Sequence, residues 1–185
     1  MKTLVLVLLF SSSFILHAAE LKVEPVYGVE RTQRHFPKPT RYKTETFFGV
    51  RALYGVPVFS FELELNLSHD KEDFPDSNLE VTYKSQKAML GARINPLANE
   101  FLSYYFRAGL RASKQSRDIK ENGENRTEDD PLNFDPYAGV GGTLRFGANF
   151  ALNAGATLIY NKNAEESEKF DTRYTFSFTM KVGNK

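Results

Sequence analysis

The chain has 185 residues, with 24 basic and 23 acidic side chains and a formal net charge of +1. This balance gives no support for nucleic-acid binding, and the absence of cysteine excludes disulfides, thiolate metal sites and cysteine catalysis. The length suits one folded domain, which we assign to residues 20–185.

Residues 1–19 are predicted to be a secretory signal peptide. Lys2 supplies a basic start, an apolar stretch follows, and cleavage after Ala18 or after Ala19 fits the small residues there. The apolar stretch is shorter than the ~20 residues that a membrane-spanning helix needs. No other long apolar run occurs, so we expect an exported chain without a transmembrane helix.

From residue 21 onward, apolar and polar side chains alternate, as they do on β-strands that have one apolar face. The third predicted strand is the clearest and reads FSFELELNL. The pattern predicts eight strands, over residues 21–29, 42–56, 59–67, 79–94, 102–112, 132–146, 150–160 and 170–182.

The fourth predicted strand changes phase halfway along its length. Leu79, Val81 and Tyr83 share one parity, whereas the apolar residues from Ala88 onward share the other. One extra residue near Gln86-Lys87 would return both groups to the same face, and this is the geometry of a β-bulge. We therefore expect a bulge there.

Short and long connections alternate along the chain. Short turns are predicted at residues 56–57, 95–100 and 147–149, and longer polar loops at residues 32–40, 69–78, 116–131 and 161–169. Short periplasmic turns that alternate with longer external loops are typical of outer-membrane barrels. An even number of strands then places both termini in the periplasm.

The apolar face is predicted to point outward, toward lipid. The opposite face carries charges of both signs and several glycines, which relieve crowding inside a narrow eight-stranded barrel. Aromatic residues, Tyr83 among them, gather near both ends of the strands, as in the girdles at membrane interfaces. The alternative is a soluble, secreted ligand-binding β-barrel whose apolar face points inward.

Strand number, face alternation and loop asymmetry together resemble the small eight-stranded outer-membrane β-barrels, the class of the OmpA transmembrane domain and OmpX. The resemblance covers residues 20–185 and rests on no sequence motif. It implies an all-β, antiparallel, up-and-down transmembrane barrel in the bacterial outer membrane. Its partners would be membrane lipid or lipopolysaccharide and, during biogenesis, the barrel-insertion machinery. The last strand departs from the class because it runs on to Gly183-Asn184-Lys185 instead of ending on an aromatic residue.

The inward charges are expected to pair across the lumen, because eight strands enclose just enough room for their own side chains. With a two-residue turn at residues 56–57, Arg51 would lie directly opposite Glu62. An unpaired carboxylate there would cost several kcal/mol, so pairing is expected and the lumen should be largely closed. A small gated pore, whose pairs exchange partners, is the alternative. The candidate site is a structural charge network of Arg51, Glu62, Glu64, Arg107 and Arg145.

No reaction can be assigned from the sequence. His35, Asp76 and Ser77 lie in the first two external loops, which resembles the placement of catalytic groups in the lipid A palmitoyltransferase family. That family, however, has an apolar pocket inside the barrel and an N-terminal amphipathic helix, neither of which is predicted here. A lipid A-modifying enzyme therefore remains an alternative only.

The acidic segment 118–130 does not match an EF-hand and is expected to be a solvated loop. No cofactor or metal is predicted. We expect a monomeric, non-enzymatic barrel with a structural, adhesive or protective role and an unidentified external partner at its loops.

Overall fold

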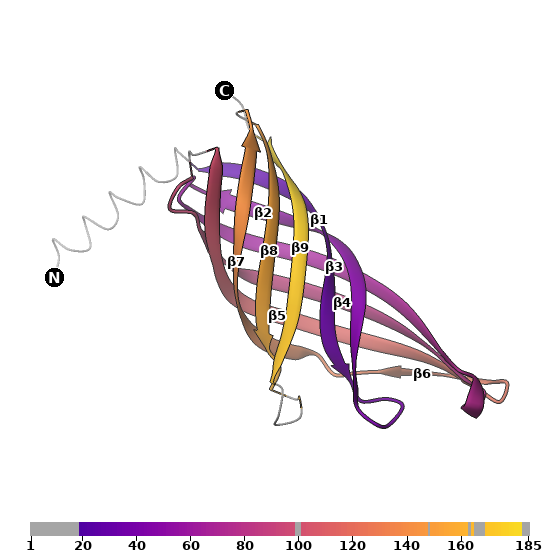
Figure 1. The fold of residues 1–185 in the computed structure, drawn as a ribbon. Helices are drawn as coiled ribbons and strands as arrows, with labels where there is room; N and C mark the ends of the chain where they lie inside the picture. Colours follow the sequence, from indigo (N-terminus) through magenta and orange to yellow (C-terminus); the bar gives the residue numbers. More distant parts are fainter. Residues whose placement is uncertain (1–18, 99–100, 148, 163, 165–168, 183–185) are drawn as a thin grey trace.

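The computed structural model describes residues 19–98, 101–147, 149–162, 164 and 169–182. The predicted signal peptide, apart from Ala19, and the residues after Val182 lie outside this range. None of the helices within it is long and apolar enough to cross a membrane. The elements are β1 (Glu20–Arg34), β2 (Arg41–Gly55), β3 (Phe59–Phe74), the 3-10 helix η1 (Pro75–Ser77), β4 (Leu79–Ile94), β5 (Leu102–Glu121), β6 (Glu124–Asp129), β7 (Asn133–Phe146), β8 (Phe150–Tyr160) and β9 (Phe170–Val182) (Figure 1).

Eight of the strands close into a barrel. The order is β1-β2-β3-β4-β5-β7-β8-β9, every neighbouring pair is antiparallel, and β9 pairs back to β1. The predicted eight-stranded up-and-down barrel is thereby confirmed. The predicted limits of three strands coincide with those of β4, β8 and β9.

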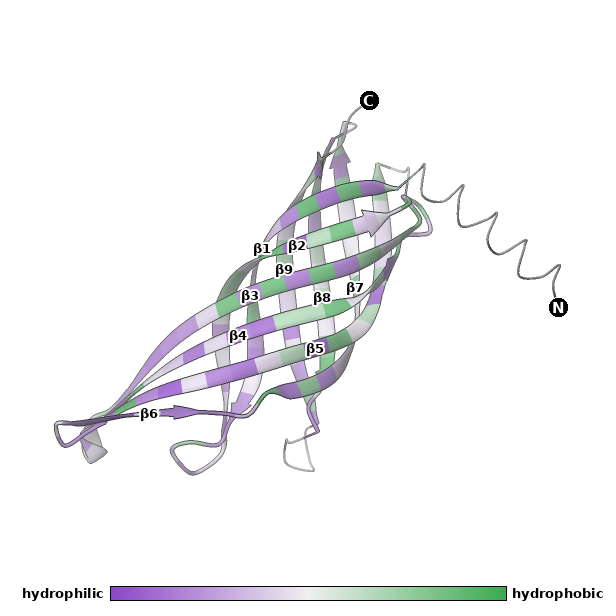
Figure 2. Cartoon of the chain, turned by 180° about the vertical axis from the view of Figure 1, so that it is seen from behind, coloured by the Kyte–Doolittle hydropathy of each residue, from purple (hydrophilic) through white to green (hydrophobic). Residues whose placement is uncertain are grey.

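The two faces of the barrel wall differ in polarity as the alternation predicted. On the outer surface, Phe48, Leu90 and Phe176 are each more than 60 % exposed. On the inner surface, Arg51 is fully buried and Glu62 is 1 % exposed. Figure 2 shows the resulting alternation of apolar and polar bands along each strand. The apolar face points outward, which contradicts the alternative of a soluble barrel with an apolar interior.

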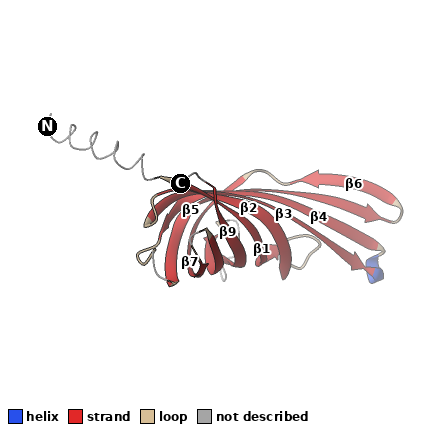
Figure 3. Cartoon of the chain, turned by 90° about the horizontal axis from the view of Figure 1, so that it is seen from above, coloured by secondary structure: helices blue, strands red, loops and turns tan. Residues whose placement is uncertain are grey.

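Beyond the barrel, part of the wall continues as a flat extension that we call the protruding sheet. It consists of residues 69–74 of β3, 79–86 of β4, 114–121 of β5, and β6. In Figures 1 and 3 it projects away from the barrel at the end opposite the short turns, with η1 at its tip. β2 accompanies β3 only as far as Ser68, so the sheet leaves the closed ring at that level.

The predicted bulge in β4 is wrong. The pairing of β4 with β3 and with β5 runs without interruption past Gln86 and Lys87. Instead, Leu79, Val81 and Tyr83 point to the same side as the lumen, where they are buried with Ile119 of β5. Tyr83 is therefore no part of an outer aromatic girdle.

The polarity of the two faces reverses because the environment changes along the strand. Within the closed barrel, the outer face of β4 exposes Leu90, whereas in the protruding sheet the same face exposes Lys84. We interpret this as the edge of the apolar belt, beyond which water replaces lipid at the outer face and apolar side chains gain by turning inward. Phe36 and Phe74 complete the resulting small core.

The predicted loop 116–131 contains a β-hairpin. β5 continues to Glu121, and β6 returns antiparallel to it, with Glu121 opposite Glu124. Asn122 and Gly123 form the connection with φ angles of 51° and 88°. Positive φ at both central residues is the signature of the type I′ turn that joins tight hairpins, and Asn-Gly is its preferred sequence. This dipeptide was the available signal; the polarity of the flanking residues concealed it.

Candidate functional site

The middle of the lumen is filled by buried charges that converge on Glu64. Arg51 donates from Nε to Glu64 Oε2 at 2.7 Å and from Nη1 to Glu24 Oε2 at 2.8 Å. Arg107 Nη2 donates to Glu64 Oε2 at 3.1 Å, and Arg173 bonds to Glu64 Oε1. None of these five side chains is more than 3 % exposed. Glu64 therefore faces three guanidinium groups, from β2, β5 and β9.

The cross-strand register differs from the predicted one by two residues. Arg51 lies opposite Glu64, whereas Glu62 lies opposite Leu53. The physical reason is the length of the turn. Gly55 pairs with Ser60, so four residues, 56–59, lie between the last paired positions instead of the two that were predicted. Glu62 nevertheless points into the lumen, with its Oε2 at 3.7 Å from Arg51 Nε and its Oε1 paired with Arg107.

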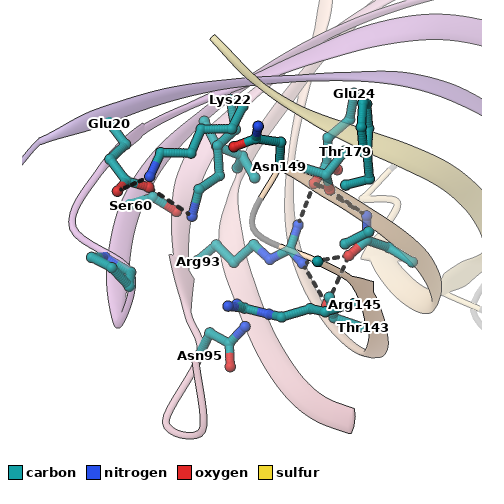
Figure 4. A pocket seen from close by; sticks show the side chains of 17 residues that line it. Glu20, Lys22, Glu24, Ser60, Arg93, Asn95, Thr143, Arg145, Asn149 and Thr179 are labelled. Atoms are coloured by element: carbon teal, nitrogen blue, oxygen red, sulfur yellow. Dashed lines mark hydrogen bonds and ion pairs between the residues drawn. The ribbon is translucent and has the colours of Figure 1, made fainter. Parts of the chain in front are cut away.

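The prediction that Arg145 belongs to this network is wrong. Arg145 lies near the end of β7, at the mouth of the barrel where the short turns are, and it lines a cavity there (Figure 4). Within the described chain, no ion pair joins it to Glu62 or Glu64. Arg173 fills the role instead. The parity of the last strand, which places Tyr174 outside, was the signal that could have identified Arg173 as lumenal.

A second layer of charges lies nearer the protruding sheet. Lys87 Nζ is 2.9 Å from Glu30 Oε1, and Arg111 Nη1 is 2.7 Å from the same oxygen. Arg111 Nη2 also lies 2.8 Å from Asp135 and 3.3 Å from Asp171. All five side chains are at least nine-tenths buried. Each layer thus combines acidic and basic groups, as burial of charge requires.

A third set of charges ties the protruding sheet to the barrel through Glu72 of β3. Arg34 Nη1 lies 2.5 Å from Glu72 Oε1, and Arg41 bonds to the other carboxylate oxygen. Burial alone would raise the pKa of Glu72. The hydrogen bond from Arg41 and the charges of Arg34, Arg41 and Lys43 outweigh it and hold the pKa below its ordinary value.

Two cavities lie on the lumen side of the wall, one at each mouth. The cavity at the short-turn mouth has a volume of about 220 Å³, and the one at the other mouth about 300 Å³. They share no lining residue, and Glu64 and its three arginine partners line neither of them, whereas Glu24 lines the cavity at the short-turn mouth.

The residues considered for catalysis do not form a cluster. His35 Nδ1 lies 3.4 Å from Thr40 Oγ1 in the connection between β1 and β2. Ser77 belongs to η1 at the tip of the protruding sheet, which is remote from that connection in both Figures 1 and 3. The side chain of Asp76 lies outside the described part. Among the described residues, no group of three or more His, Asp or Glu side chains could hold a metal ion.

Known proteins match the chain at the level of family and fold. The family profile described as "Outer membrane protein beta-barrel domain" matches residues 4–182. No curated protein matches the chain in sequence.

Solved structures similar to the chain include a major outer-membrane protein of Thermus thermophilus, with 11 % identity and a TM-score of 0.64, covering 90 % of this chain and 100 % of that one. OprG of Pseudomonas aeruginosa has 10 % identity and a TM-score of 0.61, with coverage of 90 % and 98 %. Ail, the attachment invasion locus protein of Yersinia pestis, has 10 % identity and a TM-score of 0.58, with coverage of 89 % and 99 %. At these identities the similarity is one of fold.

Proposed function

Because the chain belongs to the outer-membrane β-barrel domain family and its place is the bacterial outer membrane, we propose that it is a monomeric, non-enzymatic surface-interaction protein. In this proposal the barrel is an anchor with a closed lumen, and the protruding sheet meets an external partner in adhesion or protection. The observation that carries the proposal is the sheet itself, which extends far past the closed ring of strands.

The filled lumen supports the role of an anchor. A solute that crossed the barrel would have to pass Glu64 and its three arginine partners, which come from strands on different sides of the lumen. Separating such buried partners exposes uncompensated charge, which costs about 3–5 kcal/mol when one partner is lost. We expect planar-bilayer recordings of the purified barrel to show no conductance above the lipid background. A steady conductance would refute the closed lumen.

The surface of the protruding sheet supports contact with a partner. Its outer side carries exposed ion pairs: Lys84 Nζ lies 2.6 Å from Asp118 Oδ2, and Lys114 Nζ lies 3.2 Å from Asp129 Oδ2. Hydrogen bonds from Lys84 and Thr127 hold the pKa of Asp118 below its ordinary value, so its carboxylate stays ionised near neutral pH. Exposed pairs of this kind contribute little to stability, which leaves both charges available to a binding partner.

The names of two proteins of similar fold are consistent with this role. Ail is described as an attachment invasion locus protein, and NspA as a neisserial surface protein. The proposal for this chain rests on its own protruding sheet, and the names add only that barrels of this shape occur at bacterial surfaces.

The proposed orientation places both termini in the periplasm and the protruding sheet outside the cell. The start of β1 lies beside the end of β9, with Leu21 opposite Val182, at the same end as the short turns. Short periplasmic turns and longer external connections are the general arrangement of outer-membrane barrels.

The test is a variant in which the protruding sheet is removed and the barrel is kept. Ser68 pairs with Ser85, and Ser116 pairs with Asp129. Residues 69–84 and 117–128 can therefore each be replaced by Asn-Gly, a sequence suited to a two-residue hairpin turn. We expect cells that display this variant to lose adherence to cultured host cells and matrix-coated plates, compared with cells that display the full chain.

The control is the mobility of the variant in SDS gels before and after boiling, which reports the closed barrel. Unchanged heat-dependent mobility together with lost adherence supports the proposal. Unchanged mobility together with full adherence would show that the protruding sheet is not the contact surface.

A further inference from the structure

The cavity at the short-turn mouth is a second candidate binding site, at the end of the barrel opposite the protruding sheet. Figure 4 shows side chains from several strands converging on it, with Lys22 and Glu20 on one side and Arg145 on the other. Its volume of about 220 Å³ is many times the roughly 10–15 Å³ that one water molecule needs. A small anionic group fits this space.

Basic side chains outnumber acidic ones around this cavity. Four cations line it, and two carboxylates face them: Lys22, Arg93, Arg145 and Lys181 against Glu20 and Glu24. Glu24 is engaged by Arg51, which lies deeper in the lumen, as well as by Arg93. The mouth therefore carries an excess of positive charge, which is the opposite of the compensated layers in the middle of the lumen.

The cations differ in how well they are paired. Arg93 Nη1 donates to Glu24 Oε1 at 3.1 Å, and its Nη2 donates to Thr143 Oγ1 at 3.1 Å. Lys181 Nζ lies 2.5 Å from Glu20, and Lys22 Nζ lies 3.7 Å from the same carboxylate. One carboxylate is thus shared by two ammonium groups.

Arg145 has no such partner. Its Nε is buried and without a hydrogen bond, and within the described residues no carboxylate forms an ion pair with its guanidinium group. Figure 4 shows this guanidinium pointing into the cavity rather than away from it. The Nε atoms of Arg107, Arg111 and Arg173 also lack a hydrogen bond, but each of these guanidinium groups pairs with a carboxylate. What sets Arg145 apart is therefore the lack of a carboxylate partner among the described residues.

A second unsatisfied polar side chain lines the same cavity. Asn95 is 7 % exposed, and its Oδ1 has no hydrogen-bond partner, while its Nδ2 makes only a long bond of 3.4 Å to Ser103 Oγ. Its backbone N–H is fixed by Val58 O at 2.8 Å, so the residue is held at the mouth. The amide can turn either its oxygen or its NH₂ group to a ligand.

We propose that the short-turn mouth binds one phosphate or carboxylate group, held by Arg145 and Lys22 and contacted by the amide of Asn95. A guanidinium group matches both anions because its N–H donors form two parallel hydrogen bonds to their oxygens. Lys22 contributes a second positive charge from the facing strand β1. The inference is independent of the proposed role of the protruding sheet, since the two lie at opposite ends of the barrel.

The test is a calorimetric titration of the full-length mature barrel with inorganic phosphate, in non-ionic micelles at low ionic strength. We expect one saturable site whose affinity falls as salt is added, because the attraction is electrostatic and partly screened. Arg145→Gln should weaken binding at least about tenfold, which is about 1.4 kcal/mol. The matched control is Arg126→Gln, since Arg126 is 55 % exposed on the β5–β6 hairpin and should leave binding unchanged.

Two further arms identify the source of the anion. Titration with acetate shows whether a carboxylate is accepted as well as a phosphate. Repeating the phosphate titration in nanodiscs with and without phosphatidylglycerol shows whether a lipid headgroup occupies the site, because free phosphate would then bind only in its absence. Each variant is first checked for heat-dependent gel mobility. Folded protein that binds neither anion, or equal binding by Arg145→Gln and the unsubstituted chain, would overturn the proposal.

Discussion

Replacing Glu64 by Gln tests the idea that the lumen is held together by charge. The substitution keeps the size of the side chain and removes its negative charge. Three arginines then lose the carboxylate that they share, and they differ in the carboxylates that remain to them. Arg51 keeps Glu24 at 2.8 Å. Arg107 keeps Glu62. Arg173 keeps only Glu30, at 3.8 Å, among the ion pairs of the described residues.

The magnitude follows from the burial of these groups. Two unit charges 4 Å apart attract by about 4 kcal/mol at an effective dielectric constant of 20. The desolvation of the arginines opposes folding and is no longer offset once the carboxylate is gone, so we expect the free energy of unfolding to fall by about 3–5 kcal/mol. Adding Arg173→Met to Glu64→Gln removes the least compensated cation and should restore part of this loss, which a double-mutant cycle measures.

The assay is urea unfolding of the refolded barrel in lipid vesicles, with the folded fraction read from unheated SDS gels. The matched control is Glu80→Gln, which breaks the exposed 2.8 Å pair with Lys71 and should leave the unfolding midpoint unchanged. Equal midpoints for Glu64→Gln and Glu80→Gln would refute the reasoning that buried charge pairing stabilises this lumen.

Three other predictions address the protruding sheet and the narrow lumen. Ile119→Ala should destabilise the sheet locally by about 2–5 kcal/mol, seen as faster proteolysis of the hairpin with unchanged gel mobility of the barrel. The lowered pKa of Glu72 means that its stabilising effect is present above the unfolded-state pKa and is lost as the pH falls through the lower folded-state pKa. Amide protection factors in the sheet, which are corrected for the intrinsic pH dependence of exchange, should therefore fall below about pH 4, and less steeply in Glu72→Gln. Gly141→Ala should lower stability by about 1–3 kcal/mol, because its Cβ would overlap the ring of Tyr105; Gly142→Ala, whose Cβ has room, should not.

Local alternation was enough to predict the barrel and the polarity of its wall. Side chains on a strand point to opposite faces in turn, so the sequence alone separates an apolar outer set from a charged inner set. For the same reason Arg51, Glu62, Glu64 and Arg107 could be assigned to the lumen from their parity. The strand limits of β4, β8 and β9 followed from where the alternation begins and ends.

Parity, however, does not state which residue faces which. The partner of Arg51 depends on the length of the turn after β2. Four residues, 56–59, lie between the last pair, Gly55 and Ser60, instead of the two that were predicted, and this moves the residue opposite Arg51 from Glu62 to Glu64. The height of a residue along the barrel axis matters equally. Arg145 and Arg173 both point inward by parity, yet Arg145 lies at the short-turn mouth and Arg173 lies beside Glu64.

The sequence by itself determined that eight strands form a barrel with an apolar outside, because this information is carried by neighbouring residues. Only the tertiary structure decided where the apolar belt ends on β4, so that Val81 and Tyr83 turn inward without a bulge. It also decided that Glu64 is the centre of the lumenal charges. Both depend on side chains from distant strands and on the solvent around the wall, which no local pattern encodes.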